Sequence, residues 1–201
     1  MDENMLAVEE ELERLLEQRD YPALRGLLSA LEPPDIAQLL EAMKEEQLPL
    51  LFRILPKELA AETFVELDPS TQELLIQAFS DRELREVLDE LYMDDTVDLI
   101  EEMPANVVKR ILRNTGPSTR KTINELLNYP KDSAGSMMTT EYVDLKRDMT
   151  VVQAFERIRR TGVDKETIYT CYITDRNRKL LGYVTVKDLL LAGQQQILHR
   201  D

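Results

Sequence analysis

Residues 67–103 read LDPSTQELLIQAFSDRELREVLDELYMDDTVDLIEEM, and an apolar residue recurs in this stretch every twelve positions. The series continues toward the N-terminus, and its members are Leu31, Met43, Leu55, Leu67, Phe79, Leu91 and Met103. Proline, serine or acidic residues follow most members, which is typical of helix starts. An apolar residue or an apolar pair stands eight to nine positions after each member, which indicates one buried face per helix. Because so short a helix cannot bury its apolar face alone, we predict an α-solenoid of short stacked helices. The alternative is a plain helical bundle with chance spacing.

Charge is unevenly distributed along the 201 residues, which carry 39 acidic and 25 basic side chains. Residues 1–130 hold 29 acids and 13 bases, whereas residues 131–201 hold 10 acids and 12 bases. All nine prolines lie in the first part. This shift predicts two domains, 1–130 and 131–201, with the boundary in the turn-forming segment 128–136. The net charge of −14 repels phosphate, so we do not expect nucleic acid as a partner.

The single cysteine, Cys171, and the single histidine, His199, exclude several classes of site. One cysteine cannot form an internal disulfide framework or a cysteine-based zinc site. A histidine two residues from the C-terminus does not suit a catalytic triad. No apolar run approaches the roughly 20 residues that span a membrane. We therefore expect a soluble chain that is not an enzyme, with Cys171 as a core residue.

The second part alternates between strand and helix signals. The capping box at Thr150–Gln153 predicts a helix that stops near Gly162. The remaining predicted elements are a short strand at 143–145, a hairpin of strands 168–174 and 180–186, and a last helix from near Thr185 to Ala192. The order is β-α-β-β-α, so the predicted fold class is multi-domain, an α-solenoid followed by an α/β unit.

Residues 89–102, DELYMDDTVDLIEE, contain seven acids and no base. Asp94 and Asp98 are four residues apart, so their carboxylates share a helix face and Glu101 or Glu102 extends it. Like charges at this spacing destabilise a helix by about 0.2–0.5 kcal/mol per pair. A divalent cation such as Mg²⁺ would offset that repulsion. The alternative is that Asp94 or Asp95 caps the helix and the other acids face solvent.

Four segments of the chain resemble a known family. The run from Gly182 to Asp188, GYVTVKD, fits the G-x-x-T-x-x-D signature of a CBS domain. Residues 133–143, SAGSMMTTEYV, resemble the entry to the first CBS motif of MgtE-type magnesium transporters, and residues 166–169 also resemble that family. The acidic repeats resemble its cytosolic N domain, so the resemblance covers essentially the whole chain.

The resemblance implies a function and a set of partners. MgtE proteins are homodimeric Mg²⁺ channels or transporters of the plasma membrane, and the dimer contacts involve the CBS motifs. Ions bound between acidic faces of the N and CBS domains hold the pore closed. The chain would accordingly be a Mg²⁺-sensing regulatory region at the cytoplasmic face of the membrane, with the pore domain as its partner. The second CBS motif and the membrane domain are absent from these 201 residues.

The resemblance also implies site residues. The metal ligands would be Asp94 and Asp98 with Asp95 beside them, Glu62, and the backbone at Gly135 or Ser136. An adenine nucleotide such as ATP would bind at Thr185, Lys187 and Asp188. Thr185 and Asp188 also form a capping box, so the pair can exist only to start a helix. An adenine-nucleotide sensor and a helical-repeat scaffold for a protein partner remain alternative functions.

Overall fold

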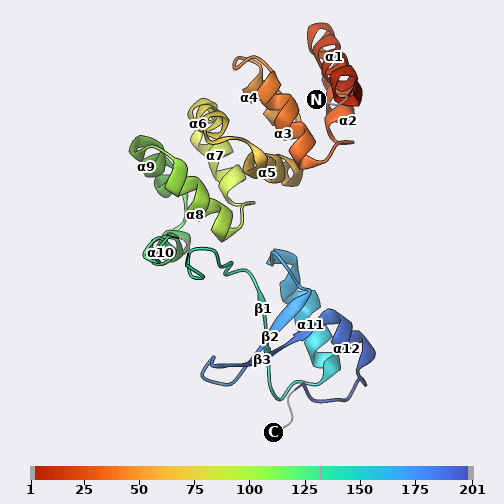
Figure 1. Ribbon diagram of the computed structural model, residues 1–201, viewed down its shortest axis with the longest axis vertical. Helices are drawn as coiled ribbons and strands as arrows, with labels where there is room; N and C mark the ends of the chain where they lie inside the picture. Colours follow the sequence, from red (N-terminus) through yellow and green to blue (C-terminus); the bar gives the residue numbers. More distant parts are fainter. Residues whose placement is uncertain (1–2, 132, 199–201) are drawn as a thin grey trace. The chain divides into compact units, whose positions relative to one another are not determined.

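The computed structural model describes residues 3–131 and 133–198, which divide into a helical part and a smaller mixed part. In the described residues the helical part contains ten α-helices, which follow one another in Figure 1. They are α1 (Glu3–Gln18), α2 (Tyr21–Leu28), α3 (Pro33–Ala42), α4 (Leu48–Ile54), α5 (Lys57–Glu66), α6 (Pro69–Ala78), α7 (Asp81–Leu88), α8 (Met93–Glu102), α9 (Ala105–Asn114) and α10 (Pro117–Leu126). None of the helices in the described residues is long and apolar enough to cross a membrane.

In the units of α5, α6, α8 and α9, the twelve-residue repeat corresponds to a helix of ten residues and a connector of two, whereas α4 and α7 are shorter helices. After α5, Leu67 ends the helix in an extended conformation, and Asp68 then caps α6 by accepting a hydrogen bond from the Thr71 amide at 2.9 Å. Most members of the apolar series hold the same position at a helix end and are buried there, namely Met43, Leu55, Leu67, Phe79 and Met103. The series thus marks the turns, where in most units a buried apolar residue follows the end of the helix.

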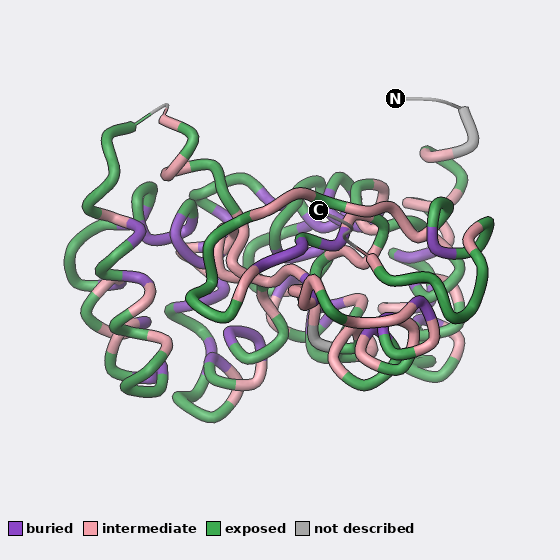
Figure 2. The backbone as a smooth tube through the Cα atoms, turned by 90° about the horizontal axis from the view of Figure 1, so that it is seen from below, coloured by how far each residue is buried: buried purple, intermediate pink, exposed green. Residues whose placement is uncertain are grey.

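Helices two apart in the sequence pack against each other. The chain of contacts α3–α5–α7–α9 forms one row, and α2–α4–α6 forms a second. Buried residues recur between exposed ones along these helices, and Figure 2 shows buried segments in purple between exposed ones in green along the backbone. The α-solenoid predicted from the repeat is therefore confirmed, because each helix buries its apolar face on neighbours rather than in one central bundle.

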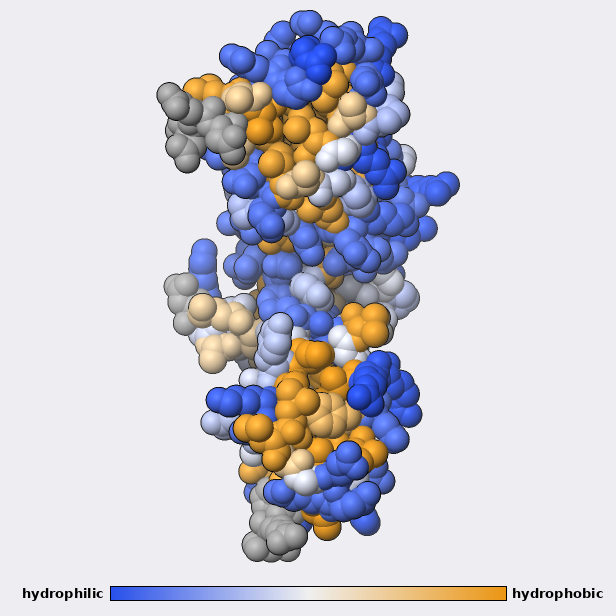
Figure 3. Space-filling view, turned by 90° about the vertical axis from the view of Figure 1, so that its right-hand side faces the viewer, coloured by the Kyte–Doolittle hydropathy of each residue, from blue (hydrophilic) through white to orange (hydrophobic). Residues whose placement is uncertain are grey.

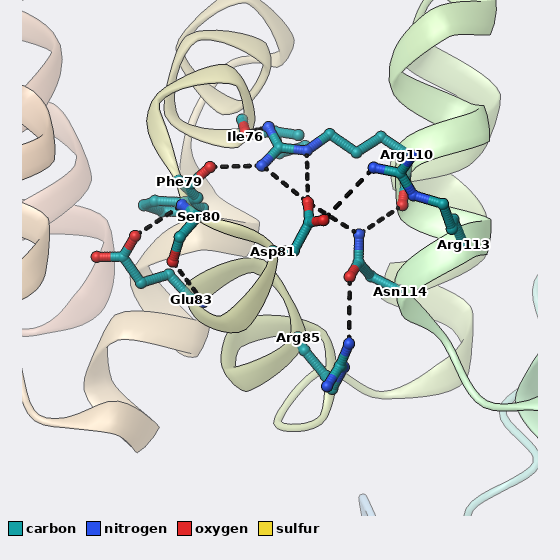
Figure 4. A network of polar contacts seen from close by, with 9 residues as sticks. All are labelled: Ile76, Phe79, Ser80, Asp81, Glu83, Arg85, Arg110, Arg113 and Asn114. Carbon is teal, nitrogen blue, oxygen red and sulfur yellow. Dashed lines mark hydrogen bonds and ion pairs between the residues drawn. The ribbon is translucent and has the colours of Figure 1, made fainter.

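Two arginines from different helices form hydrogen bonds with the connection between α6 and α7. Arg53 of α4 donates to the Ala78 carbonyl at 3.4 Å and pairs with Glu83 at 2.6 Å. Arg110 of α9 donates to the carbonyls of Ile76 and Phe79 (Figure 4). These carbonyls lie at the end of α6, where helix geometry leaves acceptors without intrahelical partners.

Side chains at the start of α7 complete this network (Figure 4). Asp81 accepts from Arg110 at 3.3 Å and from the Asn114 amide at 3.4 Å, and Arg113 lies 3.5 Å away. The Arg110 guanidinium holds the pKa of Asp81 below its ordinary value. Ser80 and Glu83 form a capping box at the start of α7.

The mixed part has the predicted order β-α-β-β-α. Its elements are β1 (Val143–Lys146), α11 (Val151–Thr161), the 3-10 turn η1 (Gly162–Asp164), β2 (Thr170–Thr174), β3 (Leu180–Thr185) and α12 (Val186–Leu191). The sheet order is β1-β2-β3, with β1 parallel and β3 antiparallel to β2. One core joins residues of the sheet to both helices, and Cys171 is fully buried in it, as predicted.

At the end of α11, the backbone of Gly162 lies close to the side chain of Ile168. A Cβ atom on Gly162 would lie 2.8 Å from Cγ2 of Ile168, well inside ordinary contact distance. The φ angle of Gly162 is −77°, so space rather than backbone conformation requires glycine here. The helix end near Gly162 was predicted from the sequence, but the 3-10 turn that begins at Gly162 was not.

Candidate functional site

The acidic residues of α8 are spread around the start and one side of that helix. Asp94 and Asp95 lie in its first turn and are half-buried, whereas Asp98 is exposed one turn further on. Carboxylates in a first turn interact favourably with the helix dipole. The Oδ1 atom of Asp94 is buried and has no hydrogen-bond partner. An orphaned carboxylate oxygen beside a second acid is a donor set that a hard cation such as Mg²⁺ fits.

A pocket of about 200 Å³ lies in the helical part against α8. Asp95, Asp98 and Glu102 line it, and all three project from α8. The opposite wall comes from the end of α5 and the start of α6 and includes Phe64 and Gln72. The structure thus selects Glu102 rather than Glu101 as the acid that extends the predicted acidic face.

Gln72 is a functional candidate that the sequence reasoning missed. Its side chain is only 6 % exposed, and its Nε2 donates to the Phe64 carbonyl at 2.8 Å. Its Oε1 is buried without a partner, which costs about 1–3 kcal/mol for a neutral acceptor. A break in the repeat could have identified it. At the same register, five residues after a series member, four other units carry the buried apolar residues Ile36, Leu48, Ala60 and Leu84, whereas one carries the buried polar residue Thr96.

The other predicted metal residues lie elsewhere in the chain. Glu62 is exposed on α5 and does not line the pocket that Asp95 and Asp98 share. Gly135 and Ser136 follow the helical part in a short turn, where the Ser136 amide donates to the Ser133 carbonyl at 3.1 Å. Among the residues that the structure describes, no three or more Asp, Glu, His or Cys side chains are grouped closely enough to hold a metal ion.

The predicted nucleotide residues lie where β3 passes into α12. Thr185 caps α12, because its hydroxyl accepts from the Asp188 amide at 3.1 Å. The Asp188 carboxylate accepts from the Thr185 hydroxyl at 2.6 Å and from the Thr185 amide at 3.1 Å. These hydrogen bonds lower the pKa of Asp188. The capping box is thus fully formed, while Lys187 and Asp188 remain exposed.

Large apolar side chains are exposed across the mixed part. Tyr183 of β3 is 69 % exposed, and Tyr172 of β2 is its cross-strand partner on the same face of the sheet. On α12, Leu190 and Leu191 are 68 % and 78 % exposed. In the lower half of Figure 3, hydrophobic residues of the mixed part form an orange patch on the surface. Apolar exposure of this extent is typical of an interaction surface.

Family models match both parts of the chain. The model described as the MgtE intracellular N domain matches residues 31–132, and the CBS domain model matches residues 134–194. The magnesium transporter MgtE of Thermus thermophilus is 35 % identical over 194 residues, which are 94 % of this chain and 42 % of that protein. The magnesium transporter MgtE of Bacillus subtilis is 26 % identical over 178 residues, or 89 % of this chain and 39 % of that protein. The chain therefore spans less than half the length of these relatives.

Two solved structures have the same fold. The crystal structure of the cytosolic domain of the Mg²⁺ channel MgtE in complex with ATP has a TM-score of 0.87 at 32 % identity, covering 94 % of this chain and 78 % of that one. The soluble part of a magnesium transporter has a TM-score of 0.85 at 23 % identity, covering 96 % of this chain and 77 % of that one. With its helical repeats, its β-α-β-β-α unit and these matches over both, the chain belongs to the MgtE family, in which it corresponds to the cytosolic region.

Proposed function

We propose that this chain is the regulatory region of a magnesium transporter and that it senses Mg²⁺ through the acids at the start of α8. The observation that carries the proposal is the buried, unpartnered Oδ1 of Asp94, with the Asp98 carboxylate four residues further along the helix. Mg²⁺ commonly uses one or two carboxylates and keeps water in its other positions, so two acids suffice. Both relatives that match most of the chain are named magnesium transporters.

The coupling to transport follows from charge. The helical part carries most of the chain's negative charge, and acids at the start of α8 repel other acids when no cation is bound. We propose that bound Mg²⁺ bridges acidic faces of the helical and CBS parts, with Glu62, Asp95 and the backbone at Gly135 or Ser136 as further ligands. Loss of Mg²⁺ would then release the two parts and favour an open pore. The region would lie at the cytoplasmic face of the membrane and would form a homodimer through its CBS motif.

Thermal unfolding with and without Mg²⁺, at constant ionic strength, tests the sensing step. We expect Mg²⁺ to raise the Tm of the native chain. The double variant Asp94→Asn, Asp98→Asn should have a higher Tm in EDTA and a much smaller response to Mg²⁺. The matched control is Glu13→Gln with Glu17→Gln, which removes two exposed acids at the same spacing on α1. An equal loss of response in both double variants would rule out a site on α8.

A second candidate function is adenine-nucleotide binding, because a structural relative at 32 % identity was solved in complex with ATP. Thr185, Lys187 and Asp188 are the proposed contacts in this chain. Titration with ATP, followed by backbone amide shifts, tests the site. Lys187→Gln is the informative variant, because it removes a charge without disturbing the capping box of Thr185 and Asp188. Shifts that are equal in this variant and the native chain would contradict the site.

A further inference from the structure

Three basic residues stand within four positions on the turn between β2 and β3. These exposed residues are Arg176, Arg178 and Lys179. None of the three forms an ion pair with another described residue, whereas Lys146 and Arg157 of the same part both pair with Asp144. In Figure 1 the turn extends from the end of the sheet as a blue loop. The turn therefore presents three positive charges to solvent without an internal partner.

Hydrogen bonds to Asp175 hold this turn in one conformation. The Asp175 amide donates to the Lys179 carbonyl at 3.0 Å, and the Asp175 carbonyl accepts from the Arg178 amide at 3.1 Å. The Oδ1 atom of Asp175 accepts from the amides of Asn177 and Lys179, both at 2.8 Å. The acid within the turn is thus committed to the backbone, and it pairs with none of the three basic side chains.

Arg178 has a backbone conformation that favours other residue types. Its φ angle is 64°, in the left-handed region that glycine and asparagine adopt most readily. An arginine held there carries a conformational cost. Its side chain is exposed and makes no hydrogen bond or ion pair to a described residue that would offset this cost. Contacts within the chain therefore do not account for arginine at this position, whereas a role in binding does.

The charge of the turn selects an anionic partner, and the charge of the rest of the chain limits its shape. Asp148 lines a pocket beside Arg176, yet bases still outnumber acids when Asp148 and Asp175 are both counted. Residues 1–130 carry 29 acids against 13 bases, so they repel a polyanion that wraps around the chain. A planar anionic surface avoids this conflict, because it can meet the turn alone and salt screens the more distant acids.

The residue that follows the three bases fits such a surface. Leu180 is 59 % exposed and begins β3 directly after Lys179. An exposed apolar side chain beside basic ones suits the boundary between lipid headgroups and acyl chains.

We propose that the β2–β3 turn docks on the anionic phospholipid headgroups of a membrane. The inference rests on the proposed function, which places the chain at the cytoplasmic face of the membrane, where the lipid surface is negatively charged. Each of the three bases contributes about fivefold to the affinity for such a surface. A chain attached to a membrane domain stays close to the bilayer, so effective concentration keeps even a weak contact occupied. The contact orients the CBS part relative to the membrane.

Cosedimentation with lipid vesicles, in EDTA and at constant ionic strength, tests the turn. We expect the chain to bind vesicles of phosphatidylglycerol and phosphatidylcholine in equal amounts, and not to bind vesicles of phosphatidylcholine alone. The triple variant Arg176→Gln, Arg178→Asn, Lys179→Gln should bind about a hundredfold more weakly. The matched control should bind like the native chain, because it removes three exposed bases of the same part that lie outside the turn, by the substitutions Arg159→Gln, Arg160→Gln and Lys187→Gln.

Line broadening of backbone amides on the same vesicles locates the contact, and it should be strongest at residues 176–180. Equal weakening in both triple variants would mean that binding follows net charge, which would overturn the proposal. Broadening centred elsewhere, or no binding of the native chain, would overturn it as well. Polyglutamate is the competing probe, and a turn that binds this peptide but not the vesicles would belong to an acidic protein partner instead.

The single variant Arg178→Asn separates binding from stability. Asparagine accepts a positive φ angle, so the Tm should stay equal or rise, while vesicle affinity should fall about fivefold. A lower Tm with unchanged vesicle affinity would show that Arg178 serves the fold, against the proposal. All these variants keep the acids of α8, and vesicle binding is measured without Mg²⁺. The docking surface and the proposed Mg²⁺ site can therefore fail separately.

Discussion

The helical part and the CBS part differ in how completely each buries its own apolar residues. The helical part contains most of the fully buried large side chains, among them Leu24, Leu51 and Ile111. Ten of the sixteen large hydrophobic residues exposed in the described chain lie between Met137 and Ile197, although that segment is the shorter part. The helical part is thus complete by itself, whereas the CBS part has apolar surface that its own elements leave uncovered.

The difference follows from the two architectures. In a solenoid each added helix pair covers the previous one, so the core grows with the chain. A β-α-β-β-α unit has helices on one face of its sheet only, and a unit of about 60 residues buries a smaller fraction of its surface than a larger domain does. Exposed tyrosines on β2 and β3 and exposed leucines on α12 remain for a partner to cover.

The largest effect is expected for self-association. We predict that the chain dimerises through its CBS part and that Leu191→Glu, which places a charge on a side chain 78 % exposed, abolishes the dimer. Leu6→Glu on α1, where the side chain is 46 % exposed, is the control and should leave the dimer intact. Sedimentation at several protein concentrations measures both. A native chain that stays monomeric would show that the exposed surface does not pair with a second copy.

The next largest effect is expected on the free energy of unfolding of the helical part. Arg110→Ala removes the donors to the Ile76 and Phe79 carbonyls, so we expect a loss of about 2–3 kcal/mol in the free energy of unfolding. Arg113→Ala removes only a 3.5 Å contact of an exposed side chain, and its cost should be below about 0.5 kcal/mol. Urea unfolding monitored by circular dichroism distinguishes the two. Similar costs for both variants would mean that the carbonyl contacts add no stability.

A smaller effect is expected at one close contact in the CBS part. Gly162→Ala forces a Cβ atom against Ile168 and should destabilise this part by about 1–2 kcal/mol. Gly193→Ala is the control, because nothing lies within 4 Å of its added Cβ. Hydrogen exchange, read separately for the two parts, should locate the loss in residues 133–198. Loss of protection in the helical part instead would contradict independent stability of the two parts.

The smallest effect is the pH dependence at the α6–α7 connection. The Arg53 guanidinium lowers the pKa of Glu83 from 4.5 to about 2. A lowered pKa stabilises the fold above the ordinary value of the group, and this stabilisation is lost as the pH falls toward about 2. The stability difference between the native chain and Glu83→Gln should therefore be constant above pH 5 and shrink below it. Because the Glu83 side chain is a third exposed, the difference should stay below about 1 kcal/mol. A difference independent of pH would contradict the ion pair.

Much of the fold could be predicted because the residue patterns that specify it are local in the sequence. Helix ends are specified by residues such as Asp68 and Ser80, which cap the helices that follow them. The capping boxes at Thr150 and Thr185 likewise mark the starts of α11 and α12. Apolar spacing sets which helix face is buried, so the solenoid and the β-α-β-β-α order could both be derived before any coordinates were known.

The candidate sites were less predictable because they depend on which segments meet. The spacing of Asp94 and Asp98 places both on one helix but does not indicate that Asp94 has a buried oxygen without a partner. Gln72 and Glu102 are thirty residues apart in the sequence and line one pocket only after α5, α6 and α8 pack together. The role of Arg110 was also not apparent, since its acceptors are backbone carbonyls that no residue type reveals.

The sequence by itself thus determined the elements, their order and the family, because capping and apolar periodicity act within a few residues along the chain. Tertiary structure decided which acid of the pair Glu101 and Glu102 reaches the pocket, and which buried polar atoms remain without partners. Those outcomes depend on distances between residues of different helices, and such distances are set by the packing of many side chains at once.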